Sequence, residues 1–185
     1  MRNVSVDQLA HDLSDAERAA LLVYEGELTM KTHGVGTHTS QAALKKFNRE
    51  NELLADAAER ASVLAAWLGG PAYPGDRLRE AWTRVLWHHF HDDLTGTSIP
   101  QAYQFSWNDE LVSLNQFAGV LTSAASSVAS ALDTQATGVP LVVYNPLAVD
   151  RTDPVEATVE FAGDAPAALM VTDTRTGAQS AAQVL

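Results

Sequence analysis

Two long stretches of the sequence repeat apolar residues at alternating spacings of three and four, and this pattern constrains the fold more than any other feature. The first stretch follows Thr39, and its repeat positions, apolar except for Asn51, are Leu44, Phe47, Asn51, Leu54, Ala58, Ala61, Ala65 and Leu68. The second stretch has the repeat positions Trp107, Leu111, Leu114, Ala118, Leu121, Ala125, Val128 and Leu132. Because an α-helix brings such positions onto one face, each stretch predicts a long amphipathic helix with a buried apolar face.

A shorter helix is predicted between the two long ones. Gly69-Gly70-Pro71 ends the first helix, and Asp76 is predicted to be the N-cap of the next one. The inward face of this middle helix is predicted to carry Leu78, Trp82, Val85 and His89. Three helices joined by short turns predict an antiparallel three-helix bundle over residues 39–134.

The segments on either side of the predicted bundle have a different character. Residues 1–38 contain a short helical pattern in which Ser14 and Glu17 have capping-box spacing, followed by a glycine-containing strand or loop. Residues 135–185 contain four strand-like runs, LVVYNPLAVDR, VEATVEF, ALMVTDTRTG and SAAQVL. Strands without helices between them favour an antiparallel β-sandwich, which four short strands do not close well. We therefore expect the first strands of a truncated β-sandwich, and a sequence that is a fragment at both ends.

Composition excludes several classes of partner and site. The net charge of −11 argues against nucleic acid and anionic membranes, because both require a positive surface patch. No apolar run approaches the roughly 20 residues that span a bilayer. The sequence has no cysteine, which excludes disulfides and thiolate metal sites. We expect neither a nucleic-acid nor a membrane partner.

The stretch WHHFHDDLTGTS, residues 87–98, concentrates the polar chemistry of the chain. It contains three of the six histidines, two aspartates and a Thr-Gly-Thr turn. His88 and His91 are three residues apart and would share one face of a helix. An imidazole beside a carboxylate supplies one or two ligands to a zinc ion, whereas a metal site needs three or four ligands with further support.

The spacing alone leaves several interpretations of this stretch open. A self-contained metal site would use His88, His91 and Asp92, although the remaining histidines are isolated in the sequence. Asp92 and Asp93 alone do not make a glycosidase pair, because adjacent residues rarely face each other across the required distance of about 5–10 Å. Histidine and aspartate at a helix end also cap carbonyls or bind turns, so the stretch could simply be the polar end of a helix.

Four segments resemble one enzyme family, in that family's order and over about residues 20–150. FHDDLTGTS resembles the His-His-Asp-x-x-Thr-Gly-Thr segment of glycoside hydrolase family 38, the retaining α-mannosidases. GELTMKTHGVGTHTSQAALKKFNRENELLADAAER is similar to the family's passage from the catalytic domain into the first bundle helix. SWNDELVSLNQFA is similar to the third bundle helix of bacterial members, and GVPLVVYNPLA resembles the start of the C-terminal β-domain.

The resemblance implies a division of the chain into three parts. Residues 1–38 would be the tail end of a catalytic domain with the loop that leads out of it. Residues 39–134 would be the three-helix middle domain, and residues 135–185 would begin the C-terminal β-sandwich domain. The expected fold class is therefore mainly α, an antiparallel three-helix bundle followed by the first strands of a truncated β-sandwich.

The resemblance also implies a chemistry. In this family one Zn²⁺ is held by two histidines and two aspartates, one of these aspartates is also the nucleophile, and a further aspartate is the acid/base. Carried over by motif, His91 is the last zinc ligand and Asp92 contacts the mannose ring. The other ligands, the nucleophile and the acid/base belong to a region N-terminal to this sequence, so no catalytic residue is assigned here. We expect a mannoside substrate, packing on the missing catalytic domain, and no activity of the fragment alone.

The sequence departs from the family pattern at three places. Phe90 stands at the family's first motif histidine, which is not a metal ligand, so the role implied for His91 is kept. His38 stands where many members have tyrosine. His33 lies in a loop where some members place an aromatic sugar contact, and we interpret it as a loop histidine, with a polar contact as the alternative. His88 and His89 are interpreted as bundle residues without a role in the site.

A second hypothesis comes from a different functional class. The chain could be a non-catalytic helical packing or interaction module in which His91 and Asp92 are purely structural. For the parent enzyme we expect a cytoplasmic location, because the N-terminus has no apolar signal-peptide core. A periplasmic or secreted location is the alternative, since the native N-terminus is expected to be missing.

Overall fold

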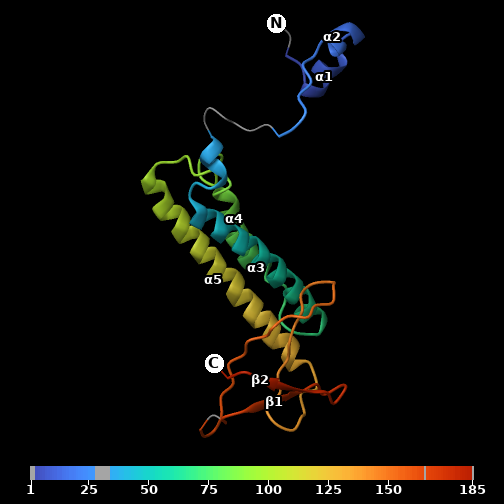
Figure 1. The fold of residues 1–185 in the computed structure, drawn as a ribbon, viewed down its shortest axis with the longest axis vertical. Helices are drawn as coiled ribbons and strands as arrows, with labels where there is room; N and C mark the ends of the chain where they lie inside the picture. Colours follow the sequence, from blue (N-terminus) through green and yellow to red (C-terminus); the bar gives the residue numbers. More distant parts are fainter. Residues whose placement is uncertain (1–2, 28–33, 165, 185) are drawn as a thin grey trace. The chain divides into compact units, whose positions relative to one another are not determined.

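A computed structural model describes residues 3–27, 34–164 and 166–184, and within them the chain is mainly helical (Figure 1). These residues form five α-helices, one 3-10 helix and two β-strands. The chain divides into two compact units, Met1–His38 and Thr39–Leu185. No helix in the described ranges is long and apolar enough to cross a membrane.

The first unit contains short helices, α1 (Val6–His11), α2 (Asp15–Ala19) and the 3-10 helix η1 (Val35–His38). The predicted capping box is confirmed, because the Ser14 side chain accepts the Glu17 backbone N–H while the Glu17 carboxylate accepts the Ser14 backbone N–H. These two bonds satisfy donors that the first turn of α2 leaves free. His33 and the strand-like alternation at 28–32 lie outside the described residues.

The second unit contains three longer helices, α3 (Ala42–Trp67), α4 (Gly75–Trp87) and α5 (Pro100–Ser130). Gly69 has a φ of +85° just beyond α3, the left-handed conformation that ends many helices. Pro100 opens α5, where its missing N–H costs no helical hydrogen bond. Asp76 is in the first turn of α4 rather than at the N-cap, which is Pro74.

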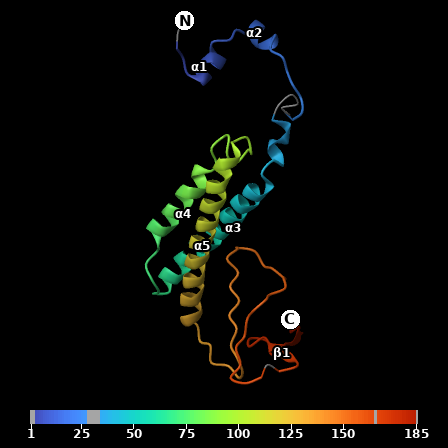
Figure 2. The same ribbon diagram turned by 90° about the vertical axis from the view of Figure 1, so that its left-hand side faces the viewer.

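Helix α5 packs against both α3 and α4, and the three lie side by side in two perpendicular views (Figure 2). Small residues of α3 let the backbones approach closely, and the Trp82 and Phe117 rings meet edge to face at 5.6 Å. The buried apolar residues form two clusters, Ala55, Ala58, Leu78, Ala81, Val85, Phe117 and Val120, and Ala61, Ala65, Ala124 and Val128.

The apolar face predicted for α5 is wrong by one residue along most of the helix. Trp107 and Leu111, predicted to be buried, are 39% and 45% exposed. In α3 the predicted face is better, since Leu44, Asn51, Ala58, Ala61 and Ala65 are all buried. The residues that α5 buries are Tyr103, Ser106, Glu110, Ser113, Phe117, Val120, Ala124 and Val128.

Three of the residues that replace the predicted apolar ones in α5 are polar, Ser106, Glu110 and Ser113, and hydrogen bonds explain their burial. The Ser113 hydroxyl donates to the Ala81 carbonyl of α4 at 3.3 Å. The Asn51 amide of α3 donates to both the backbone carbonyl and the carboxylate of Glu110 in α5. Asn51 Oδ1 and Glu110 Oε1 are buried without a hydrogen-bond partner among the described residues.

Only part of the predicted β-region forms strands in the described residues. Strands β1 (Leu169–Thr172) and β2 (Gln179–Ala182) pair antiparallel, with Leu169 opposite Ala182. The Asp173 carboxylate accepts the Arg175 backbone N–H and the Thr176 hydroxyl in the connecting turn, which lowers the pKa of Asp173. The predicted strands in 141–151 and 155–161 have no ladder partner there, although Tyr144 packs on the helical core.

Replacing Glu110 with glutamine should remove a pH dependence from folding. Burial raises the pKa of Glu110 to about 7 from its ordinary 4.5, so the folded chain holds this proton more tightly than the unfolded chain. The resulting stabilisation is complete below about pH 4.5 and is lost as the pH rises through about 7, an effect of at most about 3 kcal/mol. Urea unfolding at about pH 5 and pH 8 should show a larger loss of stability for the wild type than for Glu110→Gln. Equal losses would contradict this prediction.

Candidate functional site

The stretch WHHFHDDLTGTS connects α4 to α5 and forms a compact turn. Helix α4 ends at Trp87 with His88 as its C-cap, so His88 and His91 do not share a helix face as the spacing had predicted. Backbone hydrogen bonds then close the turn, from Asp93 N to Phe90 O at 2.9 Å and from Thr97 N to Asp92 O at 3.0 Å. Gly96 has a φ of +82°, which a residue with a side chain rarely adopts.

His91 and Asp92 project outward from this turn next to each other. Their side chains are 76% and 49% exposed, and His91 Nε2 lies 3.3 Å from Asp92 Oδ2. The Phe90 ring lies against the His91 imidazole, with 4.2 Å between the ring centroids. The Thr97 hydroxyl donates to Asp92 Oδ1 at 2.9 Å, leaving the other carboxylate oxygen toward His91. The turn thus presents an imidazole nitrogen and a carboxylate side by side to solvent.

His88 and Asp93 point the opposite way, into the helical core. Both residues are buried, and His88 Nδ1 lies 2.5 Å from Asp93 Oδ2. The Ser106 hydroxyl of α5 lies within hydrogen-bond distance of both Asp93 oxygens, at 2.8 and 2.9 Å. On its other side His88 Nε2 lies 3.2 Å from the half-exposed Asp109 carboxylate. A buried carboxylate therefore has partners on both α4 and α5.

Helix α5 also holds the end of the turn through Tyr103. The Tyr103 hydroxyl accepts the Ser98 backbone N–H at 2.8 Å and donates to the Asp92 carbonyl at 3.2 Å. Because the ring is buried, the position of this hydroxyl is fixed, and its hydrogen bond holds the backbone at Asp92.

Helix α3 holds the turn from another direction. The Lys45 ammonium donates to the Leu94 carbonyl at 2.8 Å and to the Ser40 carbonyl, and partial burial lowers the pKa of Lys45. The Ser40 hydroxyl donates to the Gly96 carbonyl at 3.0 Å. His89, predicted to lie on the inward face of α4, is exposed, and its Nε2 lies 2.6 Å from Asn48 Oδ1 of α3.

The described residues do not form a complete metal site. They contain no group of three or more histidine and acidic side chains placed to hold one ion. A site of His88, His91 and Asp92 does not match the geometry, because both ring nitrogens of His88 face carboxylates in the core. The exposed imidazole and carboxylate of His91 and Asp92 are groups that zinc accepts as ligands. The donor set therefore fits a contribution to a metal site that other residues complete.

Comparison with known proteins identifies the family. The sequence model described as Alpha mannosidase middle domain matches residues 32–128, more than half of the chain and all of the turn. The chain belongs to the α-mannosidase middle-domain family. The resemblance to α-mannosidases that the sequence indicates is thereby confirmed.

Curated relatives of this α-mannosidase middle-domain chain are much longer proteins. Alpha-mannosidase 2C1 of Mus musculus is 31% identical over 140 residues, covering 75% of this chain and 13% of the mouse protein. Alpha-mannosidase 2C1 of Homo sapiens is 38% identical over 87 residues, covering 46% of this chain and 8% of the human protein. Alpha-mannosidase of Saccharomyces cerevisiae is 33% identical over 108 residues, covering 55% of this chain and 10% of the yeast protein. The chain thus matches about a tenth of these relatives' length, and no solved structure matches it.

The hydrophobic pattern of this middle domain predicts no role in holding the turn for His88, Asp93, Ser106, Tyr103 or Lys45. Hydrophobic patterning assigns polar residues to the surface, and it placed Trp107 rather than Ser106 in the core. A usable signal was the large aromatic pair Tyr103 and Phe117, which lie two heptads apart and mark the true buried face of α5.

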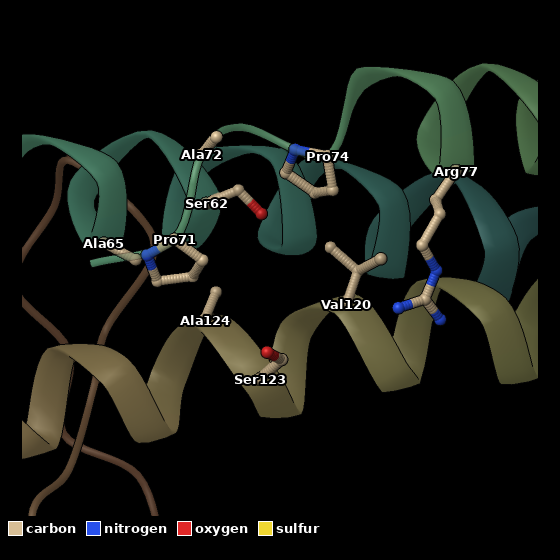
Figure 3. Close-up of a pocket in the computed structure, with 9 residues that line it drawn as sticks. All are labelled: Ser62, Ala65, Pro71, Ala72, Pro74, Arg77, Val120, Ser123 and Ala124. Atoms are coloured by element: carbon tan, nitrogen blue, oxygen red, sulfur yellow. The ribbon is translucent and has the colours of Figure 1, made fainter.

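A hollow in the middle domain lies away from the turn (Figure 3). It has a volume of about 190 Å³ between α3, the α3–α4 loop and α5. Its lining includes Arg77 but no histidine or carboxylate, so it offers no acid/base or metal-ligating group. The lining residues are Ser62, Ala65, Pro71, Ala72, Pro74, Arg77, Val120, Ser123 and Ala124.

Replacing Gly96 with alanine should destabilise the fold by about 2–4 kcal/mol, which urea unfolding would measure. The added Cβ would lie 2.7 Å from Ser40 Cβ and 3.0 Å from the Ser40 carbonyl carbon, in addition to the cost of a φ of +82°.

Gly69→Ala is the matched control, because Gly69 has a φ of +85° with nothing within 4 Å of the added Cβ. It should cost only the conformational energy, about 1 kcal/mol. A Gly96→Ala cost no larger than that of Gly69→Ala would show that Ser40 does not hold the turn closely.

Proposed function

We propose that this chain is part of a retaining, zinc-dependent α-mannosidase that hydrolyses terminal α-mannosides. The observation that carries the proposal is the outward pair His91 and Asp92, on a braced turn inside the region that matches the α-mannosidase middle domain. In this proposal His91 Nε2 or Nδ1 is one of four zinc ligands, and the Asp92 carboxylate accepts hydrogen bonds from hydroxyls of the mannose ring. The names of the curated relatives support α-mannosidase activity of the parent protein.

The geometry of the pair suits these two roles. An exposed imidazole offers a nitrogen lone pair without leaving a buried partner unsatisfied, and His91 is 76% exposed. The Asp92 carboxylate lies 3.3 Å from that ring, so an ion held by His91 and a sugar hydroxyl held by Asp92 would be neighbours. When bound, a divalent ion at this position would supply Lewis-acid stabilisation and hold vicinal hydroxyls in place. The chain's own contribution is to fix where the imidazole and the carboxylate stand.

The proposal places the rest of the site outside this chain. Residues 1–38 would be the tail end of the catalytic domain, the helices α3, α4 and α5 an antiparallel three-helix bundle, and residues 135–185 the beginning of a β-sandwich domain. The nucleophile, the acid/base and three zinc ligands would come from the catalytic domain on which the bundle packs. Large apolar side chains near the turn support such packing, since Trp87 is 75% and Phe90 57% exposed.

The longer protein is this chain together with the proposed N-terminal catalytic domain. In it, His91→Ala should reduce bound zinc from one ion per chain to a small fraction and abolish cleavage of an aryl α-mannoside. Loss of one of four protein ligands should lower the metal affinity by orders of magnitude, because only three protein ligands would remain to hold the ion. Zinc content after dialysis, measured by mass spectrometry, and steady-state hydrolysis are the two readouts. The 185-residue chain alone should show neither activity nor stoichiometric zinc.

His11→Ala in the same longer protein is the control, because His11 is an exposed histidine at the end of α1. It should leave zinc content and hydrolysis unchanged. Full zinc occupancy in His91→Ala would refute the ligand role. Tight, stoichiometric zinc on the 185-residue chain would instead indicate a self-contained site, and a longer protein without hydrolysis would favour a non-catalytic packing module.

A further inference from the structure

Neighbouring side chains of the turn differ in burial. The His91 side chain is exposed and that of Asp92 half-exposed, whereas Asp93, the next residue, is buried. Asp93 is also part of the turn's backbone, since its N–H donates to the Phe90 carbonyl and its carbonyl accepts the Gly96 N–H, both at 2.9 Å. Loss of the contacts that hold the Asp93 side chain would therefore loosen the backbone that carries Asp92 and His91.

Two side chains hold the Asp93 carboxylate in the core. His88, at the end of α4, is 4% exposed, and its Nδ1 lies 2.5 Å from Asp93 Oδ2. Ser106 of α5 is 1% exposed, and its hydroxyl lies 2.8 Å from Asp93 Oδ1. A buried carboxylate without such partners is strongly unfavourable and would turn toward solvent.

We propose that His88, together with Ser106, is a positioning residue for the His91–Asp92 pair: it holds the Asp93 carboxylate in the core and so fixes the turn from which that pair projects. The inference rests on the proposed function of His91 and Asp92. His88 touches neither substrate nor metal in this arrangement and acts only through Asp93. The Nδ1 side of the ring carries the effect, whereas the Nε2 side faces the half-exposed Asp109.

Two amide variants separate the two sides of the imidazole. The asparagine amide can occupy the place of the histidine Nδ1, so His88→Asn keeps a donor toward Asp93. The longer glutamine amide occupies the place of Nε2, so His88→Gln keeps a donor toward Asp109 and loses the one toward Asp93. If His88 were only a buried polar side chain that stabilises the fold, both substitutions should destabilise the chain and speed exchange to a similar degree.

The first readout is amide hydrogen exchange of the 185-residue chain, which requires no metal. His88→Gln should speed exchange of the Gly96 and Thr97 amides at least about 10-fold, because their acceptors lie on the turn that Asp93 anchors. His88→Asn should stay within about threefold of the wild type. Similar exchange at these amides in the two variants would overturn the proposal.

The second readout is the zinc dissociation constant of the longer protein, measured by competition with a chelator. His88→Gln should weaken zinc binding about 10-fold or more, the range found when residues behind a metal ligand are lost, and His88→Asn should not. Equal zinc affinity in the two variants, with His91→Ala unable to bind zinc, would overturn the positioning role and leave the proposed function intact. Zinc retained by His91→Ala would instead refute the proposed function, and the exchange data would still decide whether His88 fixes the turn.

A pair of serine variants keeps the proposal testable if both His88 variants fail to fold. Ser106→Ala removes a hydroxyl that holds Asp93, whereas Ser113→Ala removes an equally buried hydroxyl of α5 that donates to the Ala81 carbonyl. Ser106→Ala should speed exchange at Gly96 and Thr97 and weaken zinc binding, and Ser113→Ala should do neither. Equal effects of the two serine variants would overturn the proposal.

Discussion

A buried carboxylate requires partners for its charge, and Asp93 obtains them from both helices that the turn connects. His88 provides one from the end of α4 and Ser106 the other from the first turns of α5. The same group therefore joins the two helices and helps to determine how the intervening chain is folded. Because Asp93 is bound inward, its neighbours Asp92 and His91 are left to face solvent. The exposed pair is thus a consequence of a buried interaction.

Asp93, His88 and Ser106 form one polar layer in the core. A second polar layer lies between α3 and α5. The Asn51 amide donates to the carbonyl and carboxylate of Glu110, one turn of α5 beyond Ser106. Burial raises the pKa of Glu110 to about 7, so this layer is less costly when the carboxyl is neutral. Together the two layers set which face of α5 is buried, since a rotation that buried Trp107 and Leu111 would expose these hydrogen bonds to competition with water.

The elements of the fold could be predicted from the sequence where local chemistry determines them. The α2 capping box, the end of α3 before Gly69 and the hairpin strands β1 and β2 all depend on residues close in the chain. The buried face of α5 could not be predicted, because counting apolar residues favours Trp107 and Leu111 over Ser106 and Glu110. The polar residues are buried only because Asp93 and Asn51, distant in the sequence, reach them. For the same reason the sequence predicts no role for His88, although its ring contacts both Asp93 and Asp109.

A role for His91 and Asp92 in a site is predicted only by the family resemblance. Their spacing offers too few ligands for a site, and the structure shows two accessible groups rather than a closed set. What the structure adds is that the turn carrying this pair is held by Lys45 of α3, by His88 at the end of α4 and by Tyr103 of α5. Side chains on a fixed backbone lose less conformational freedom when other residues complete a site around them. Under the proposed function, a turn braced in this way would be suited to a site completed from another domain, because the backbone of its two groups is held before that domain docks.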